Sequence, residues 1–364
     1  MQLSSAVLHR DAARSGFSEK PTRRGRIQQL IEAAARLGVV RAIRPLHERW
    51  RGSLRVLAYH RVMPTDALDA YPFDPELISA TPAQFEWQMD YIRRHLKPVS
   101  LKDVLAHLDG ERALPTGAVA VTFDDGFGDT YRYAFPILKR YAIPATIFLA
   151  TGYVDSGEPF WFELVAYLIH RVEPHSLTVE NSVQRFPRGP SVSERAQSLR
   201  RVQDMLKAMP QTRRTAIISD WARRYSAQIE HGAAGHSRPI SWAQVREMAG
   251  AGIEFGSHSV THPNLTQLAD AELDWELVES KRVLQERLQC EARTLAYPIG
   301  TRSAFDARVV AAAQRAGFQL GASYISGANP LAQLDRFGLR RHGIGRGTTA
   351  HYFRALTSLP SWVH

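Results

Sequence analysis

The stretch AVAVTFDDGF, residues 118–127, predicts a buried strand that ends in two acidic residues. Its apolar part, Val119–Phe123, is rich in β-branched residues and does not alternate, as expected for a strand covered on both faces. Asp124 and Asp125 follow directly, before Gly126. Because α/β proteins carry their chemistry at the carboxyl ends of strands, this pair is a candidate site. Asp-Asp-Gly also makes plain tight turns, so the pair alone does not decide the function.

Five more short apolar segments resemble Val119–Phe123 and alternate with segments of helical periodicity. They are Leu54–Tyr59, Ala145–Ala150, Ile253–Ser257, Thr294–Tyr297 and Phe318–Ser323. Capping boxes predict helices that begin after Thr81, Ser100 and Ser241. Longer helical patterns run over Ala271–Leu288 and Phe305–Ala316. The alternation predicts an α/β fold with a mainly parallel sheet.

Two histidines follow the strand expected at Ile253–Ser257. His258 and His262 are four residues apart, a spacing that lets both side chains bind one metal ion from a helical turn. Such a pair alone is more often structural. Combined with one aspartate of the first pair it provides three ligands, and the second aspartate remains free to accept a proton. These residues favour metal-assisted hydrolysis.

The composition is that of a folded protein. The chain has 364 residues, of which 44% are hydrophobic and 23% charged, and this balance excludes a disordered, collagen-like or transmembrane-bundle protein. The single cysteine, Cys290, excludes an internal disulfide and an all-cysteine zinc site.

The net charge of +10 is concentrated at the start of the chain. Residues 1–55 contain 12 Lys or Arg against 4 Asp or Glu, and the rest is close to neutral. No zinc finger or other nucleic-acid motif follows, so we expect no nucleic-acid partner. Apolar residues recur at helical spacing between Ile27 and Leu46, which predicts a basic helical arm over residues 1–53. This arm either packs on the body or docks on an anionic membrane surface.

The sequence also gives an expected location and domain organisation. Its first residues lack a secretory pattern, so we expect a cytoplasmic protein that the arm can hold at the inner face of the membrane. Residues 155–240 break the β/α alternation, which resumes at Ser241. We therefore expect one domain over residues 54–350 with a helical insertion at 155–240, near the mouth of the fold, and a tail at 351–364.

Three motifs in this order resemble the polysaccharide deacetylases, also called carbohydrate esterase family four or the NodB-homology family. They are TFDDG (122–126), HSVTH (258–262) and LAYPIG (295–300). The resemblance covers roughly residues 55–346 with the insertion set aside. YHRV (59–62) is similar to the branch of that family associated with bacterial exopolysaccharide assembly. The resemblance implies a distorted (β/α) barrel, usually with seven strands.

The resemblance also implies roles for the acidic residues and the histidines. Asp124 would be the catalytic base, and Asp125, His258 and His262 would hold a divalent metal ion, most often Zn²⁺. A histidine near the end of the domain is the family's catalytic acid, and His342 is the candidate here.

The third motif implies groups that contact the substrate. The backbone N–H of Ile299 falls where the family provides an oxyanion donor, with Tyr297 and Pro298 beside it. The family often has an arginine at the position of Ala296, where it orients the base. Alanine cannot do this, and Arg341 could reach the site from another strand end.

Two further residues are candidates for binding sugar. His60 ends the first expected strand and either contacts the substrate or is structural. Trp161, at the start of the insertion, either stacks on a sugar ring or belongs to a small core.

The function expected from these residues is a metal-dependent de-N-acetylase that acts on an N-acetylhexosamine-containing polysaccharide or its precursor. The acetylated glycan is then its main partner. The alternatives are a metal-dependent O-acetyl esterase or amidohydrolase, and a glycan-binding pseudoenzyme. The complete set of Asp124, Asp125, His258 and His262 argues against the pseudoenzyme.

Overall fold

The computed structural model describes residues 52–65, 71–172, 176–179, 182–185, 192–225 and 238–358. All six segments predicted as strands are strands, with bounds within two residues of those expected. They are β1 (Ser53–Tyr59), β5 (Ala118–Phe123), β6 (Ala145–Leu149), β9 (Glu254–Ser257), β10 (Thr294–Ala296) and β11 (Leu320–Ala322). They pair in the order β11-β10-β9-β6-β5-β1, every pair parallel. The predicted parallel sheet is confirmed.

A seventh segment, residues 339–343, joins the two edges of this sheet. Its end, β13 (His342–Gly343), pairs in parallel with β1, while Leu339 bridges Ala322 of β11. The Ser323 N–H donates to the Leu339 carbonyl at 2.8 Å, and the Ile344 N–H donates to the Ala58 carbonyl at 2.9 Å. The sheet therefore curls into the distorted barrel that the resemblance implied, with the carboxyl ends of its strands at one mouth.

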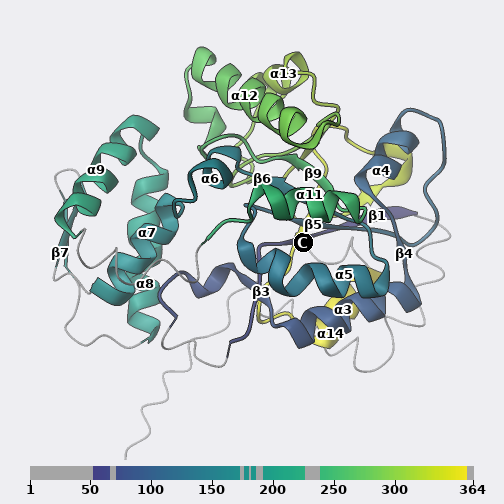
Figure 1. The fold of residues 1–364 in the computed structure, drawn as a ribbon, viewed down its shortest axis with the longest axis horizontal. Helices are drawn as coiled ribbons and strands as arrows, with labels where there is room; N and C mark the ends of the chain where they lie inside the picture. Colours follow the sequence, from purple (N-terminus) through teal and green to yellow (C-terminus); the bar gives the residue numbers. More distant parts are fainter. Residues whose placement is uncertain are drawn as a thin grey trace, which may run out of the picture.

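Helices cover the outside of the barrel (Figure 1). The three expected capping boxes are present at the starts of α3 (Pro82–His95), α4 (Leu101–Leu108) and α11 (Trp242–Gly250). The two long helical patterns form α12 (Asp270–Leu288) and α13 (Ala307–Arg315). Shorter elements complete the barrel domain: β2 (Arg61–Val62), η2 (Pro75–Leu77), β3 (Ile78–Ala80), β4 (Lys97–Pro98), η3 (Thr130–Ala134), α5 (Phe135–Tyr141), α6 (Thr151–Ser156), η5 (Leu265–Gln267), β12 (Asn329–Pro330) and η6 (Leu331–Gln333).

The main core lies between the sheet and the helices below it in Figure 1. Phe123 of β5 stacks on Tyr59 of β1, with ring centroids 5.4 Å apart, and meets Phe85 of α3 edge-on at 5.7 Å. All three side chains are fully buried. Each such burial contributes about 1.5–3 kcal/mol, so this core holds β5 firmly where it ends in Asp124 and Asp125.

The described residues between 161 and 225 form a lobe beside the barrel, at the left of Figure 1. Its described helices are α7 (Trp161–Tyr167), η4 (Leu168–Val172), α8 (Val192–Lys207) and α9 (Gln211–Arg224). They pack around a core of their own that includes Val165, Leu206 and Trp221. The lobe also contains a hairpin that the sequence patterns did not predict, β7 (Ser176–Val179) with β8 (Ser182–Arg185).

The expected N-terminal arm cannot be compared with the structure, whereas the expected C-terminal tail is in part a helix. Residues 1–51, which hold nearly all of the expected basic arm, lie outside the described residues. Residues 351–358, expected to be a tail, instead belong to α14 (Ala350–Ser358), whose Phe353 is buried in the main core. Its carbonyls at Thr357 and Ser358 accept hydrogen bonds from the buried Arg55, which explains why this segment is ordered on the barrel. Within the described chain, no helix has the length and apolar character to cross a bilayer.

Candidate active site

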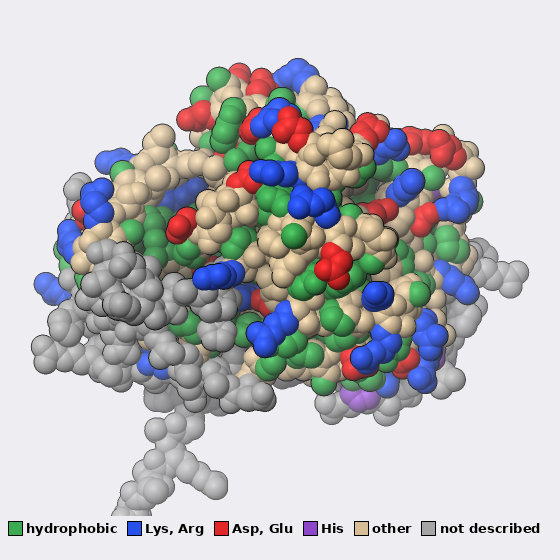
Figure 2. Space-filling view, viewed as in Figure 1, with side chains coloured by type: hydrophobic (Ala, Val, Ile, Leu, Met, Phe, Trp, Pro, Cys, Tyr) green, Lys and Arg blue, Asp and Glu red, His purple; other side chains and the backbone are tan. Residues whose placement is uncertain are grey.

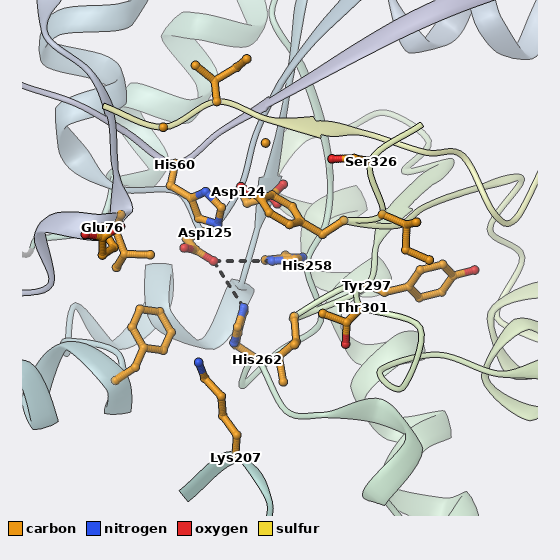
Figure 3. Close-up of a pocket in the computed structure, with 18 of the residues that line it drawn as sticks. His60, Glu76, Asp124, Asp125, Lys207, His258, His262, Tyr297, Thr301 and Ser326 are labelled. Carbon is orange, nitrogen blue, oxygen red and sulfur yellow. Dashed lines mark ion pairs between the residues drawn. The ribbon is translucent and has the colours of Figure 1, made fainter. Parts of the chain in front are cut away.

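Three side chains of metal-ligand type meet at the mouth of the barrel. Asp125 follows β5, and His258 and His262 follow β9. Asp125 Oδ1 lies 3.5 Å from Nε2 of each histidine, and one ligand atom from each residue lies within 4.8 Å of the other two. Figure 3 shows both rings directed at the Asp125 carboxylate. The structure brings together the three residues expected to hold a metal.

The chemistry of this cluster fits a bound divalent cation. Asp125 Oδ1 is buried and has no hydrogen-bond partner among the described residues. Burial lowers the pKa of both histidines, that of His258 to about 4, so the imidazoles are neutral and do not form ion pairs with Asp125. His258 Nδ1 contacts the Ala296 carbonyl at 2.8 Å, which leaves the Nε2 lone pair facing Asp125. A carboxylate oxygen without a partner, facing two neutral imidazoles, suits a zinc-type ion.

The backbone around the cluster adopts conformations that side chains rarely permit. Asp125, Ser259, His262 and Ile299 have φ between 55° and 75°, in the left-handed region. Gly126 continues the turn at φ 88°, and a Cβ there would lie 2.6 Å from Leu149 Cδ2. Such strain is tolerated where surrounding structure holds it, and it collects at functional sites.

A buried glutamate of α12 holds the turn that carries the two histidines. Glu276 Oε2 accepts hydrogen bonds from the backbone N–H groups of Val260 and Thr261, at 2.7 and 2.9 Å. The Thr261 hydroxyl donates to the other oxygen of the same carboxylate. Glu276 is 2% exposed. The histidine turn is therefore fixed by one charged group buried beneath it.

The other aspartate, Asp124, forms a two-hydrogen-bond ion pair with Arg341, which lies in the segment that closes the barrel. Arg341 Nη1 and Nη2 donate to the two carboxylate oxygens of Asp124 at 2.6 and 2.9 Å, and its Nε donates to the Ser323 carbonyl at 2.8 Å. Both side chains are buried. Arg341 thus makes the contact with Asp124 that Ala296 cannot make.

This ion pair keeps Asp124 ionised. Burial, the largest single effect, raises the pKa of Asp124, but the charge and hydrogen bonds of Arg341, together with the nearby His258 and His60, lower it by more than burial raises it, and the pKa falls to about 2. Asp125 differs, because burial and the neighbouring Asp124 charge raise its pKa. The two adjacent carboxyl groups are therefore in opposite electrostatic environments. Asp124 is stabilised in its ionised form by Arg341, whereas Asp125 needs a bound cation to stabilise its ionised form.

These groups line a cleft of about 1170 Å³ at the barrel mouth. One wall consists of residues of the barrel loops, and Phe162, Gln203 and Lys207 of the insertion form another. Tyr352 of α14 also lines the cleft.

Three of the residues expected to contact substrate line this cleft, in different ways. His60 lies next to Asp125 in Figure 3, and its ring meets Tyr324 edge-on at 5.5 Å. The Ile299 N–H has no acceptor among the described residues. Tyr297 points away from Asp125 and donates its hydroxyl to the Phe337 carbonyl at 2.9 Å, so its ring has a mainly structural role.

Of the aromatic cluster Phe160–Phe162, Phe162 lines the cleft and Trp161 does not. Trp161 does not line the cleft and packs instead under Arg214, whose guanidinium lies 4.8 Å from its ring centroid. Phe162 lines the cleft, 5.5 Å from the His262 ring. The expected sugar contact of Trp161 is corrected accordingly. Neighbouring residues of a helix point in different directions, and the sequence did not show which direction faced the barrel.

His342, Pro298 and Arg341 do not line the cleft either. His342 is 1% exposed and belongs to β13, where successive side chains point to opposite faces. Because Arg341 points to Asp124, His342 points away from it, so His342 is not placed to act as the acid. Arg341 contacts Asp124 and lies behind the cleft lining.

Sequence reasoning missed two groups that support the site. One is Glu276, which no motif marks within an ordinary helical pattern. The other is Arg61, fully buried, which donates to Asp129 at 2.6 Å and to Glu163 of the insertion at 2.9 Å. A signal for Arg61 was present, since YHRV places an arginine two residues after the expected strand Leu54–Tyr59.

A model of the polysaccharide deacetylase family matches residues 111–218 and 186–321. These matches span more than half of the chain, including Asp124, Asp125 and both histidines. The chain belongs to the polysaccharide deacetylase family. It is a hydrolase of the class that acts on carbon–nitrogen bonds.

Relatives and solved structures agree with this assignment. YxkH of Bacillus subtilis, named as a polysaccharide deacetylase, is 21% identical over 302 residues, which are 83% of this chain and 75% of YxkH. The poly-β-1,6-N-acetyl-D-glucosamine N-deacetylase of Staphylococcus aureus is 34% identical over 109 residues, 28% of this chain and 37% of the relative's length.

Two solved structures share the fold. The Streptococcus pyogenes deacetylase PplD has a TM-score of 0.55 at 19% identity, over 83% of this chain and 96% of that one. IcaB from Ammonifex degensii has a TM-score of 0.53 at 20% identity, over 85% and 97%. The distorted barrel is thus shared with known deacetylases.

Proposed function

We propose that this protein is a metal-dependent de-N-acetylase that hydrolyses the acetamido groups of an N-acetylhexosamine-containing glycan. One observation carries the proposal: an ionised carboxylate, Asp124, is held by Arg341 directly beside the three-ligand cluster of Asp125, His258 and His262, in a cleft. A divalent ion on these ligands would supply Lewis acidity and acidify water.

Asp124 is suited to accept the proton of the attacking water. Its low pKa keeps it ionised at neutral pH, and the two hydrogen bonds from Arg341 fix its plane. A third hydrogen bond of Arg341, from Nε to the Ser323 carbonyl, holds its guanidinium group beside Asp124. Arg341 is therefore a positioning residue for the base.

The cleft offers groups for two further steps: stabilising the negative charge that develops on the acetyl oxygen, and protonating the leaving nitrogen. The Ile299 N–H is available to donate to the oxygen on which negative charge develops. His60 is, among the described residues, the one histidine of the cleft apart from the two metal ligands. We assign it the donation of a proton to the leaving nitrogen, in place of His342. Burial lowers the pKa of His60 more than the Asp124 charge raises it, so a proton on His60 is readily released.

The choice of an N-acetylated glycan rests on the family and on the named relatives. The Staphylococcus aureus relative acts on poly-β-1,6-N-acetyl-D-glucosamine, which makes oligomers of this type the first substrates to test. An esterase acting on O-acetyl groups would use the same residues. The two activities differ in product, since only the de-N-acetylase exposes a free amine.

The test combines metal analysis with product analysis. Purified protein loaded with Zn²⁺ is incubated with N-acetylglucosamine oligomers and with O-acetylated oligosaccharides, and acetate and free amine are measured. We expect equal amounts of both products from the oligomers. Asp124→Asn should retain the metal and lose on the order of 10²–10⁴ in rate, while the exposed Asp274→Asn control retains full rate. Acetate from esters alone, or metal without turnover, would contradict the proposal.

A further inference from the structure

The wall of the cleft contains basic side chains that the proposed chemistry does not use. Lys207, Arg302 and Arg340 line the cleft, and among the described residues no side chain accepts a hydrogen bond or ion pair from their charged groups. Lys207 is half-buried and Arg302 is exposed. Figure 3 shows the Lys207 ammonium group aimed into the cleft near His262.

Elsewhere on the surface, many arginines form ion pairs with nearby carboxylates. Both signs are mixed over the face in Figure 2. Exposed arginines on several helices pair with nearby carboxylates, as in Arg94–Asp90, Arg140–Glu86, Arg282–Glu279 and Arg315–Asp274. Lys207, Arg302 and Arg340 differ from these arginines, because no described side chain pairs with their charged groups.

Lys207 and Arg302 belong to one rim of the cleft. The turn η5 lies between the segments that carry them. Gln267 donates to the Lys207 carbonyl at 3.2 Å, and the adjacent Thr266 hydroxyl donates to the Ser303 carbonyl, next to Arg302, at 2.9 Å. We call Lys207 and Arg302 together the basic rim. Because η5 comes shortly after His262 in the chain, the basic rim lies on the side of the cleft that His262 occupies.

The carboxylates of the cleft do not cancel the basic rim. Asp124 is paired with Arg341, and Asp125 belongs to the ligand cluster. Asp74 accepts from the Glu76 N–H at 3.0 Å and from Gln203 at 3.5 Å, so it is engaged within the wall. Glu76 lies beside His60 in Figure 3, away from Lys207.

We propose that the basic rim binds a negatively charged substituent, a carboxylate or a phosphate, on a sugar next to the one that is deacetylated. The natural glycan is then acidic, and the rim selects acetylated residues that have a charged neighbour. This inference rests on the proposed de-N-acetylase function and specifies its substrate class. A lysine and an arginine with water access can bind either anion, and the arginine can bind it through two hydrogen bonds.

The test compares three acetylated oligosaccharides of equal length: a neutral N-acetylglucosamine oligomer, one alternating N-acetylhexosamine with hexuronic acid, and one carrying phosphate. Zn²⁺-loaded protein should show a KM about three- to tenfold lower for one acidic oligomer than for the neutral one, with the difference shrinking in added salt. The acidic oligomer with the lower KM identifies the anion.

Variants separate the rim from charge in general. Lys207→Gln with Arg302→Gln should raise KM for the preferred acidic oligomer by about three- to tenfold, leaving kcat and the neutral oligomer unchanged. Lys102→Gln with Arg246→Gln removes the same charges from exposed positions on α4 and α11 and should change nothing. Equal KM values for all three oligomers, or equal losses in both double variants, would overturn the inference.

A binding measurement keeps this test independent of turnover. Calorimetry on the Asp124→Asn protein measures affinity for each oligomer without hydrolysis, and repeats the comparison in the rim variants. If no oligomer releases acetate, the proposed function fails, while preferential binding of an acidic oligomer that depends on the rim would still support a subsite for anions. If binding shows no preference, the rim inference fails even when acetate is released.

Discussion

Replacing Arg341 with methionine should expose how strongly the structure depends on the pair with Asp124. The substitution keeps the approximate length of the side chain and removes its charge. It leaves both Asp124 oxygens, and the Ser323 carbonyl, without their buried donors. The Asp124 carboxylate is then a desolvated charge with no cation of the chain against it.

The magnitude follows from the burial of this ion pair. The pKa of Asp124, about 2 in place of 3.8, shows that the favourable contacts of its carboxylate, with those of Arg341 first among them, outweigh desolvation. Removing one partner of a buried ion pair costs about 3–5 kcal/mol, because the other charge remains buried. Since the folded pKa lies below the unfolded value, this stabilisation is complete above pH 3.8 and is lost as the pH falls toward 2. We therefore expect Arg341→Met to lose about 3–5 kcal/mol of unfolding free energy at pH 7, and less below pH 4.

Urea unfolding of metal-free protein between pH 3.5 and 7.5 measures this loss. Arg315→Met, which removes an arginine from an exposed pair, is the control and should cost less than about 1 kcal/mol. In metal-loaded protein the acid limb of the kcat/KM profile should move to higher pH, because Asp124 binds a proton more readily without Arg341. A loss below 1 kcal/mol together with an unmoved acid limb would refute the assigned role of Arg341.

Three further outcomes are expected. Glu276→Gln should weaken Zn²⁺ affinity about 10- to 100-fold, because the turn that carries His258 and His262 loses its charged hydrogen-bond acceptor. Competition with a chelator measures this affinity, and an unchanged value would show that the turn keeps its conformation without the Glu276 charge. His262→Ala should abolish stoichiometric metal binding while His342→Ala retains it, and metal loss in the second variant alone would reverse the assignment. Arg61→Met should lower the free energy of unfolding in urea by about 3–5 kcal/mol, because Asp129 and Glu163 stay buried without the arginine that pairs with them. An unchanged free energy of unfolding would show that the Arg61–Glu163 ion pair does not help to hold the insertion on the barrel.

Local sequence patterns were enough to predict the strands of the parallel sheet, several of its helices and the polar residues at its edge. Apolar runs without alternation indicated the six parallel strands, and the side chains at Thr81, Ser100 and Ser241 marked helix starts, because both signals depend on residues close together in the chain. The parallel arrangement then placed the residues after β5 and β9 at one edge of the sheet. That is why one aspartate of the pair Asp124 and Asp125 could be grouped with His258 and His262 from the order of strands and polar residues in the chain, while the family resemblance gave the ligand role to Asp125.

The side chains that complete the site depend instead on long-range packing. The pair of Arg341 with Asp124 spans 217 residues and depends on how segment 339–343 closes the barrel. The same closure turns His342 away, since neighbouring residues of a strand face opposite sides. The packing of the insertion placed Phe162, and not Trp161, against His262, and brought Lys207 to the cleft. These choices follow from the curl of the sheet and the docking of the lobe, which local sequence patterns do not encode, because many distant contacts set them together.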